Sequence, residues 1–497
     1  MHRVRVRLAT RMAALGAARI GVVATAVGIV GAWAFVAAAA PEATDVALHL
    51  ARAIRFETIS FEDPAAFRGE PFEALFDELE RMYPRTHARL SLERVGGYTL
   101  VFEWPGRDAA LEPALFMSHT DVVPVEPDAR STWTHPPFAG TIADGRVWGR
   151  GAIDVKVGVI LWLEAVEALL AEGFVPERTL YLVFGHDEET GGAQGALQVA
   201  RRMAERGTRL AFVFDEGGGI FEGHPLLPDR TVASVVTAEK AYYTVELTAP
   251  GRSGHSSMPP RSTAIGRLAR AIHRVEEHPM PARLCEPMRE LLTAVAPYQP
   301  FGRRLAFSHL GLAGGLVEQG MLADPVGASL VRTTVAATLV SGGVKQNVLP
   351  ESARATLNVR LLPGDTPEDV LAHLERVIDD PEIAIEGRSW GVPPRAASVS
   401  GEGYRLAVDA VHAVYPDMPV LPGLVPGATD SRHFAEVARE IYRFVPSRIP
   451  IEDASGAHGR DERIAVEGLG DSAAIAIGLM RRAGSRPALV ADEARGS

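Results

Sequence analysis

The chain has 497 residues, of which 47% are hydrophobic and 23% charged, so it can bury two cores, or one large core with a smaller domain inserted. Its formal net charge of -11, with no Lys/Arg stripe to offset it, argues against a nucleic-acid partner. The single cysteine, Cys285, excludes an internal disulfide and a thiolate cluster, so any metal site must use His, Asp and Glu.

The first 42 residues differ from the rest of the chain. Residues 20–40 contain no charge over about 21 positions, enough to cross a bilayer core as a helix, and five arginines precede them. We therefore predict an N-terminal hydrophobic helix, with the body outside the cytoplasm, in the cell envelope or secreted. The length favours an uncleaved membrane anchor over a signal peptide. Small residues near Ala38 and Ala40 resemble a cleavage site, so both interpretations stay open.

From residue 43 to 240, short apolar runs alternate with amphipathic stretches, which is typical of parallel α/β units. Strands are expected at 114–119, 179–186 and 210–218, and a helix at 157–170. Acidic residues follow these strands, and ligands of such sheets bind beyond the carboxyl ends of strands. We predict the first part of a catalytic domain with a mixed, mostly parallel sheet.

The pattern changes over residues 241–391, where two segments alternate like antiparallel strands and two have helical spacing. The strands are expected at 241–250 and 352–364, and the helices at 263–277 and 366–379. Residues 280–345, rich in Pro and Gly, give no clear assignment. We predict an inserted α+β domain here, and a second part of the catalytic domain at 392–490 with helices near 401–415 and 466–482.

Two positions near the predicted strands suggest metal chemistry. His119 and Asp121 are two apart at a strand end, so both side chains can point the same way and the carboxylate can orient the imidazole. Asp154 lies in a glycine-bounded segment, where a carboxylate can project between two cations, although it could also cap the helix that follows.

Three later segments add acids and a second histidine. Glu188 and Glu189 follow a strand and diverge in direction, so one can bind a metal while the other moves protons. Asp215 comes first after the next strand, with Glu216 as the alternative ligand, and His458 lies in a small-residue loop. Each signal alone is commonly a solvated turn. Two imidazoles with three carboxylates together predict a pair of zinc ions, for which manganese or cobalt could substitute.

Ten motifs in chain order identify a resemblance to a known family: SHTDVVP, WTHPPFAG, GRGAIDVK, GHDEETGG, DEGG, GHSSMPP, NVLP, LNVRLLPG, GATDSRHF and GAHGRDERI. On these motifs, residues 45–485 resemble the co-catalytic zinc aminoacylase and carboxypeptidase family. Within it, the chain is similar to the branch of yeast vacuolar carboxypeptidase S and the mammalian N-fatty-acyl-amino acid synthase/hydrolase. The resemblance implies that the α+β insert is a ferredoxin-like lid or dimerisation domain.

The resemblance also implies a role for each site residue. Asp154 would bridge two zinc ions, with His119 and Asp215 on one, Glu189 and His458 on the other, Glu188 as the base and Asp121 orienting His119. His255 would reach the substrate carbonyl, commonly across a homodimer interface. Asn347 and Arg360 would hold the substrate carboxylate beside a loop containing Thr429 and Asp430. A cis peptide is expected after Asp154, where Val155 replaces the acidic or amide residue of many relatives.

We therefore expect a zinc-dependent amidohydrolase that cleaves, and also forms, N-acyl amino acids with a free carboxylate. A metallocarboxypeptidase acting on short peptides is the alternative. A serine hydrolase using Ser256 or Ser257 is disfavoured because the spacing is not that of a nucleophile elbow. A non-catalytic anchored binding protein is disfavoured because no expected ligand or base is missing.

Overall fold

The computed structural model describes residues 40–389 and 395–486. The hydrophobic segment expected at 20–40 therefore lies, except for Ala40, outside the described residues. Within the two described ranges, every helix is either too short or too polar to span a bilayer.

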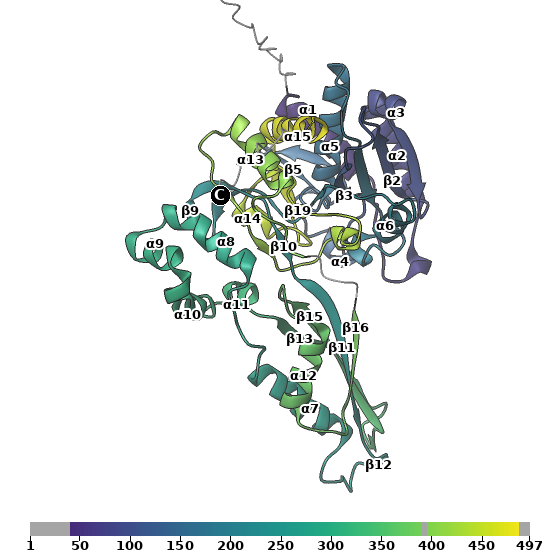
Figure 1. Cartoon of the computed structure of the whole chain (residues 1–497). Helices are drawn as coiled ribbons and strands as arrows, with labels where there is room; N and C mark the ends of the chain where they lie inside the picture. The colour runs from purple at the N-terminus through teal and green to yellow at the C-terminus, as the bar shows by residue number, and fades with distance from the viewer. Residues whose placement is uncertain (1–39, 390–394, 487–497) are drawn as a thin grey trace, which may run out of the picture. The chain divides into compact units, whose positions relative to one another are not determined.

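A mixed six-stranded sheet forms the centre of the α/β part (Figure 1). In spatial order its strands are β1 (Ser91–Val95), β2 (Thr99–Trp104), β6 (Leu180–Gly185), β3 (Ala114–His119), β7 (Phe212–Asp215) and β19 (Ile441–Arg443). The last four run parallel, whereas β1 and β2 pair antiparallel. The strands predicted at 114–119, 179–186 and 210–218 are confirmed, with ends within three residues of the prediction.

Both faces of this sheet are buried. Alternate side chains such as Phe116 and Phe214 pack on one face, and Leu115 and Val213 on the other. The first face is covered by α1 (Ala43–Ile54), α5 (Lys156–Ala171), α13 (Glu402–Val414) and α15 (Leu469–Gly484), and the second by α6 (Ala196–Glu205). Because both faces are packed, polar side chains of the parallel strands gather at their carboxyl ends.

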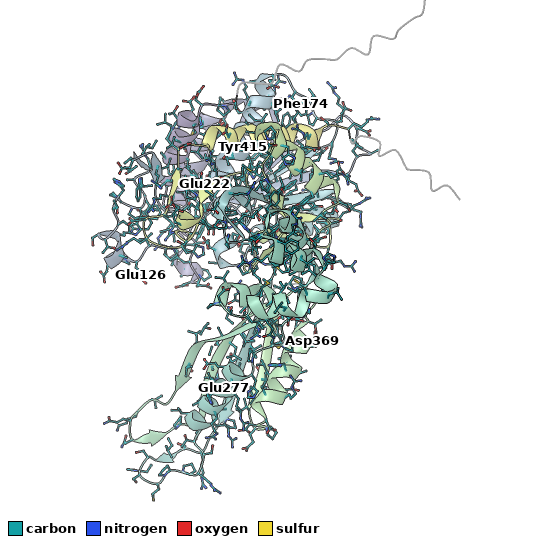
Figure 2. All side chains as sticks on the ribbon, turned by 90° about the vertical axis from the view of Figure 1, so that its left-hand side faces the viewer. Glu126, Phe174, Glu222, Glu277, Asp369 and Tyr415 are labelled. Atoms are coloured by element: carbon teal, nitrogen blue, oxygen red, sulfur yellow. The ribbon has the colours of Figure 1, made fainter. Side chains whose placement is uncertain are left out.

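A second sheet is entirely antiparallel and has its own core. Its order is β13 (Thr334–Gly342), β15 (Ser352–Leu361), β11 (Ala241–Pro250) and β16 (Ala384–Ser389). Helices α7 (Ala264–Glu277) and α12 (Pro367–Ile378) pack on it; Figure 2 labels Glu277 and Asp369 on them. The chain order β-α-β-β-α-β is that of a ferredoxin-like unit. A lid or dimerisation role for this unit stays a prediction.

The segment that the sequence left unassigned is mostly helical. It contains α8 (Glu286–Val295), α9 (Phe301–Ser308), α10 (Leu310–Met321) and α11 (Pro325–Val331). Proline in the first turns of α8 and α11 marks where these helices begin, and α10 is rich in glycine. Helices of about two turns give too few repeats for their periodicity to stand out. Their buried face packs against Leu227, Val232 and Leu421.

Short strands join distant parts of the chain. β5 (Arg146–Trp148) pairs with β4 (Thr141–Ala143) and with β21 (Arg463–Ala465), and β10 (Ala238–Glu239) pairs with β18 (Leu424–Val425). The remaining elements are α2 (Glu70–Met82), α3 (Pro84–Arg89), α4 (Pro127–Arg130), β8 (Gly219–His224), β9 (Leu227–Ser234), β12 (Gly254–His255), β14 (Val348–Leu349), β17 (Val420–Leu421), β20 (Arg448–Pro450) and α14 (Ile451–Ala454). The β5–β21 pair brings the segments that contain Asp154 and His458 together.

Candidate metal centre

Three parallel strands deliver the polar side chains of the site. His119 is the last residue of β3, Glu188 and Glu189 follow β6, and Glu216 follows β7. Their carboxyl ends lie at one edge of the sheet because β6, β3 and β7 are adjacent and parallel. The edge is therefore rich in carboxylates.

Asp154 places one carboxylate oxygen in each of two groups of ligand atoms. Its Oδ1 lies 3.1 Å from His119 Nε2, which is 3.2 Å from Glu216 Oε1. Its Oδ2 lies 3.0 Å from His458 Nε2, which is 3.1 Å from Glu189 Oε2. Within each group the ligand atoms lie within 4.8 Å of one another. One carboxylate shared between two such groups is the geometry of a bridging ligand.

At one predicted ligand position the structure places Glu216, rather than Asp215, in a ligand group. Asp215 does not join either group: its Oδ2 accepts a hydrogen bond from the Ser431 backbone N at 2.8 Å. Glu216, the alternative, occupies the position expected for it. Consecutive residues at a strand end point in opposite directions, so only one of the two can face the cluster. Sequence alone did not show which one does.

Asp121 fixes both the imidazole of His119 and the loop after β6. The His119 Nδ1 lies 3.0 Å from the Asp121 backbone oxygen and 3.4 Å from Oδ1. The buried carboxylate also accepts hydrogen bonds from Ser60 Oγ and from the backbone N of Glu188 and Glu189. Burial alone would raise the pKa of Asp121, but His119 and these donors hold it below its usual range.

The peptide between Asp154 and Val155 is cis, as the resemblance implied.

The charges at the site fit divalent cations. Hydrogen bonds that His458 donates to Asp154 and Glu189 raise its pKa to about 10, so the carboxylates favour a positive charge where a cation would bind. Burial raises the pKa of Glu189, and its Oε1 is buried with no hydrogen-bond partner among the described residues. Imidazoles and carboxylates without sulfur are a ligand set that zinc, manganese or cobalt accepts.

Glu188 lies beside the two groups without belonging to either. Burial raises its pKa well above the usual range, and the charges of Glu216, Asp430 and Glu189 add to the shift while His119 opposes it. A bound cation would counter this shift by favouring the ionised carboxylate. A carboxylate that lies near the cation positions but does not coordinate a cation can accept a proton.

The placement of Arg360, on β15, fits a carboxylate-binding role. Its guanidinium lies over the Tyr242 ring, 4.5 Å from the ring centre, and its Nε donates to Asn358 Oδ1. Burial lowers its pKa, and Glu188 is among the charges that oppose this shift. The Arg360 guanidinium is thus within electrostatic reach of the site.

Thr429 and Asp430 are both buried. Glu239 accepts hydrogen bonds from the backbone N and Oγ1 of Thr429, and Glu239 is itself 3.0 Å from the buried guanidinium of Arg443. Burial, with the charges of nearby aspartates, raises the pKa of Asp430 well above its usual range. Neither of its carboxylate oxygens has a hydrogen-bond partner among the described residues. A substrate-binding role for this loop stays a prediction.

His255 and Asn347 lie together but apart from the ligand groups. The backbone oxygen of Asn347 accepts from Ser256 N, next to the short β12–β14 pair, and both residues are exposed. The His255 Nδ1 accepts from the Ser257 backbone N and contacts Ser257 Oγ at 2.8 Å. Across residues 40–389 and 395–486, no hydrogen bond or ion pair joins them to the metal centre.

Sequence reasoning missed the residues that support the ligands. The sequence did not predict the roles of Ser60, Glu239 and Arg443. A polar residue that binds a distant loop has no local sequence pattern that distinguishes it from other polar residues. Arg150 and Glu462 stand inside motifs that were recognised, but their positions, 312 apart, did not reveal that they are 2.6 Å from each other.

The chain is similar to known proteins over most of its length. A profile of peptidase family M20/M25/M40 matches residues 115–482. The probable carboxypeptidase S-like 2 of Dictyostelium discoideum is 37% identical over 430 residues, covering 85% of this chain and 82% of the relative. The N-fatty-acyl-amino acid synthase/hydrolase PM20D1 of Xenopus tropicalis is 34% identical, with 84% and 81% covered. Carboxypeptidase S of Saccharomyces cerevisiae is 30% identical, with 84% and 81% covered.

A solved structure supports the fold alone. The M20 family metallo-carboxypeptidase Sso-CP2 from Sulfolobus solfataricus superposes with a TM-score of 0.66 at 20% identity. The match covers 88% of this chain and 99% of that one.

The two adjacent acids at the end of β7, Asp215 and Glu216, make a matched test of the ligand assignment. Glu216→Gln should weaken zinc binding by more than the about 10- to 100-fold typical of a lost outer partner, because it removes a direct ligand. Asp215→Asn should stay within or below that range. Competition with a chromophoric chelator measures both affinities. A larger loss in the Asp215 variant than in the Glu216 variant would contradict the assignment.

Proposed function

Because the chain belongs to peptidase family M20/M25/M40, it is a metal-dependent hydrolase of amide or peptide bonds, and we propose that its substrates are N-acyl amino acids with a free carboxylate. The observation that supports this most is Asp154, with one oxygen in each ligand group. The relatives named for N-fatty-acyl-amino acids, and the Arg360 guanidinium near the site, favour the substrate class.

Each ligand group would hold one zinc ion, with manganese or cobalt as substitutes. His119, Asp154 and Glu216 form one position, and Asp154, Glu189 and His458 the other. When bound, the two ions supply a water molecule of lowered pKa and polarise the substrate carbonyl.

The side chains divide the remaining work. Glu188 takes a proton from the attacking water and delivers it to the departing nitrogen. Asp121 orients the His119 ring through its Nδ1. Arg360 binds the two oxygens of the substrate carboxylate, since a planar guanidinium matches that group. Thr429 and Asp430 line this pocket. The reverse reaction, condensation of a fatty acid with an amino acid, uses the same groups.

His255 and Asn347 serve the site of a second subunit. Within the antiparallel sheet, β15 runs from Ser352, beside their loop, to Arg360 at the other end. Eight residues of strand span about 26 Å, so Arg360 and His255 of one chain are too far apart to hold the carboxylate and the neighbouring amide carbonyl of one substrate molecule. β13 is an edge strand with Leu339 and Val340 about two-thirds exposed, a surface through which a homodimer would form.

The N-terminal segment supports a location outside the cytoplasm. Its uncharged stretch and the five arginines before it favour a membrane-anchored body, or a secreted body if the segment is cleaved. An anchored site would meet long-chain acyl substrates at the bilayer where they concentrate.

The second candidate function is release of the C-terminal residue of short peptides, favoured by the similarity to carboxypeptidase S. Purified enzyme should cleave N-oleoyl-phenylalanine with a higher kcat/KM than a blocked dipeptide. N-oleoyl-phenylalanine amide, which lacks the carboxylate, should be a poor substrate of the same enzyme. Faster cleavage of the dipeptide by orders of magnitude would make the chain a carboxypeptidase.

Arg360→Ala tests the carboxylate site. Loss of a charge-assisted contact of about 1.5–3 kcal/mol should raise KM for N-acyl amino acids about 10- to 100-fold, with a smaller change in kcat. Arg354→Ala is the matched control, because Arg354 lies on the same strand, is exposed and is 3.8 Å from Glu246. An unchanged KM in the Arg360 variant would remove this residue from substrate binding.

Mixing two inactive variants tests the shared site. Glu188→Gln lacks the base but retains its metals, and His255→Ala lacks the carbonyl contact. After subunit exchange, a mixed dimer has one intact site, and activity should recover to about a quarter of wild type. Failure to recover, with exchange verified by mass, would place His255 in its own subunit or outside the reaction.

A further inference from the structure

One buried ion pair links the two chain segments that contain Asp154 and His458. Arg150 and Glu462 are 3% and 0% exposed, and Arg150 Nη1 lies 2.6 Å from Glu462 Oε2. The pairing of β5 with β21 brings them together, since Arg150 follows β5 and Glu462 immediately precedes β21. Neither side chain is a candidate ligand.

The Glu462 carboxylate holds the backbone before Asp154. Its Oε2 accepts from Gly151 N at 3.0 Å, and its Oε1 accepts from Ile153 N at 2.7 Å and from Asp154 N at 3.0 Å. Three backbone donors and one guanidinium thus converge on a single carboxylate. These hydrogen bonds fix the backbone position of Asp154 and so the direction in which its side chain points into the site.

The Arg150 guanidinium holds the other segment. Its Nη2 donates to the backbone oxygens of His458 and Gly459, each at 3.0 Å. His458 has a φ of 59°, a left-handed conformation that is unfavourable for a non-glycine residue and persists only where contacts enforce it. Its side chain is 56% exposed, so packing gives it little support.

The other ligand group is supported differently. His119 is 2% exposed at the end of a central strand and is oriented by Asp121. Glu216 follows the neighbouring strand β7. Of that group, only Asp154 depends on Glu462.

We propose that Arg150 and Glu462 are positioning residues that set the spacing between Asp154 and His458, and that they selectively support the cation bound by Asp154, Glu189 and His458. This inference rests on the proposed function insofar as that function requires two cations. Without the pair, the position formed by His119, Asp154 and Glu216 keeps its ion, while the other loses affinity.

Zinc titration of the full chain against a chromophoric chelator tests the proposal. Glu462→Gln preserves side-chain size but turns an amide N–H toward donors, either Arg150 or the backbone of residues 151–154. Arg150→Lys keeps the charge but cannot reach Glu462 and two carbonyls at once. Wild type should bind two zinc ions tightly. Each variant should bind the second ion about 10- to 100-fold more weakly, with a smaller loss for the first, because only one ligand of that group depends on Glu462.

Asp453→Asn is the matched control. Asp453 is a fully buried carboxylate in the nearby helix α14, paired with Arg463 at 2.6 Å and Arg146 at 3.2 Å. The Asp453→Asn variant should retain both zinc ions. Circular dichroism verifies folding, and Arg150→Lys decides the question if Glu462→Gln does not fold.

The outcomes separate the two proposals. Two unchanged affinities in the Arg150 and Glu462 variants overturn the positioning role, and so does an equal loss in the Asp453 variant. A wild-type protein that binds fewer than two ions overturns the dinuclear function itself, whatever the variants do.

Discussion

Four carboxylates meet in a largely buried space at the edge of the central sheet: Asp154, Glu188, Glu189 and Glu216. Removing ionised carboxylates from water is unfavourable, and bringing them together adds repulsion. The two imidazoles offset part of this cost, and burial with like charges still raises the pKa of Glu188, Glu189 and Glu216. Divalent cations balance the remaining charge. The surrounding structure therefore has to keep like charges together until cations bind.

A second set of acids provides this support by binding backbone rather than metal. Asp121 accepts from the N–H groups of Glu188 and Glu189, Asp215 from Ser431, Glu239 from Thr429, and Glu462 from three residues ending at Asp154. Each of these carboxylates joins two segments that are distant in sequence. Hydrogen bonds to charged acceptors are stronger than those to neutral ones, so these carboxylates hold the loops at this edge in place. Rigid loops keep the ligand atoms at distances that suit a cation pair.

Much of the fold and the site follows from the sequence because the relevant signals are local. The periodic runs of β11 and α7 and the apolar run of β3 predicted their elements closely, and His119, Asp154, Glu189 and His458 converge as expected. The choice between Asp215 and Glu216 depends on the direction of one residue at a strand end, which composition does not encode. The short helices between residues 286 and 331 have too few turns for a clear period, and Arg150 with Glu462 are joined only by tertiary structure.

In the proposed homodimer, the two ends of strand β15 contribute to two different sites. The Arg360 end of β15 serves the site of its own subunit, and two segments near its other end, β12 with His255 and the loop with Asn347, serve the site of the partner. Two-fold symmetry makes this exchange reciprocal, so one register of pairing along β13 completes both sites together. A shift of two residues in that register would move His255 by about 7 Å, more than a hydrogen bond tolerates. The irregularity in β13 between Ala337 and Leu339, which interrupts its pairing with β15, lies on that edge and would restrict the registers that a second strand can adopt.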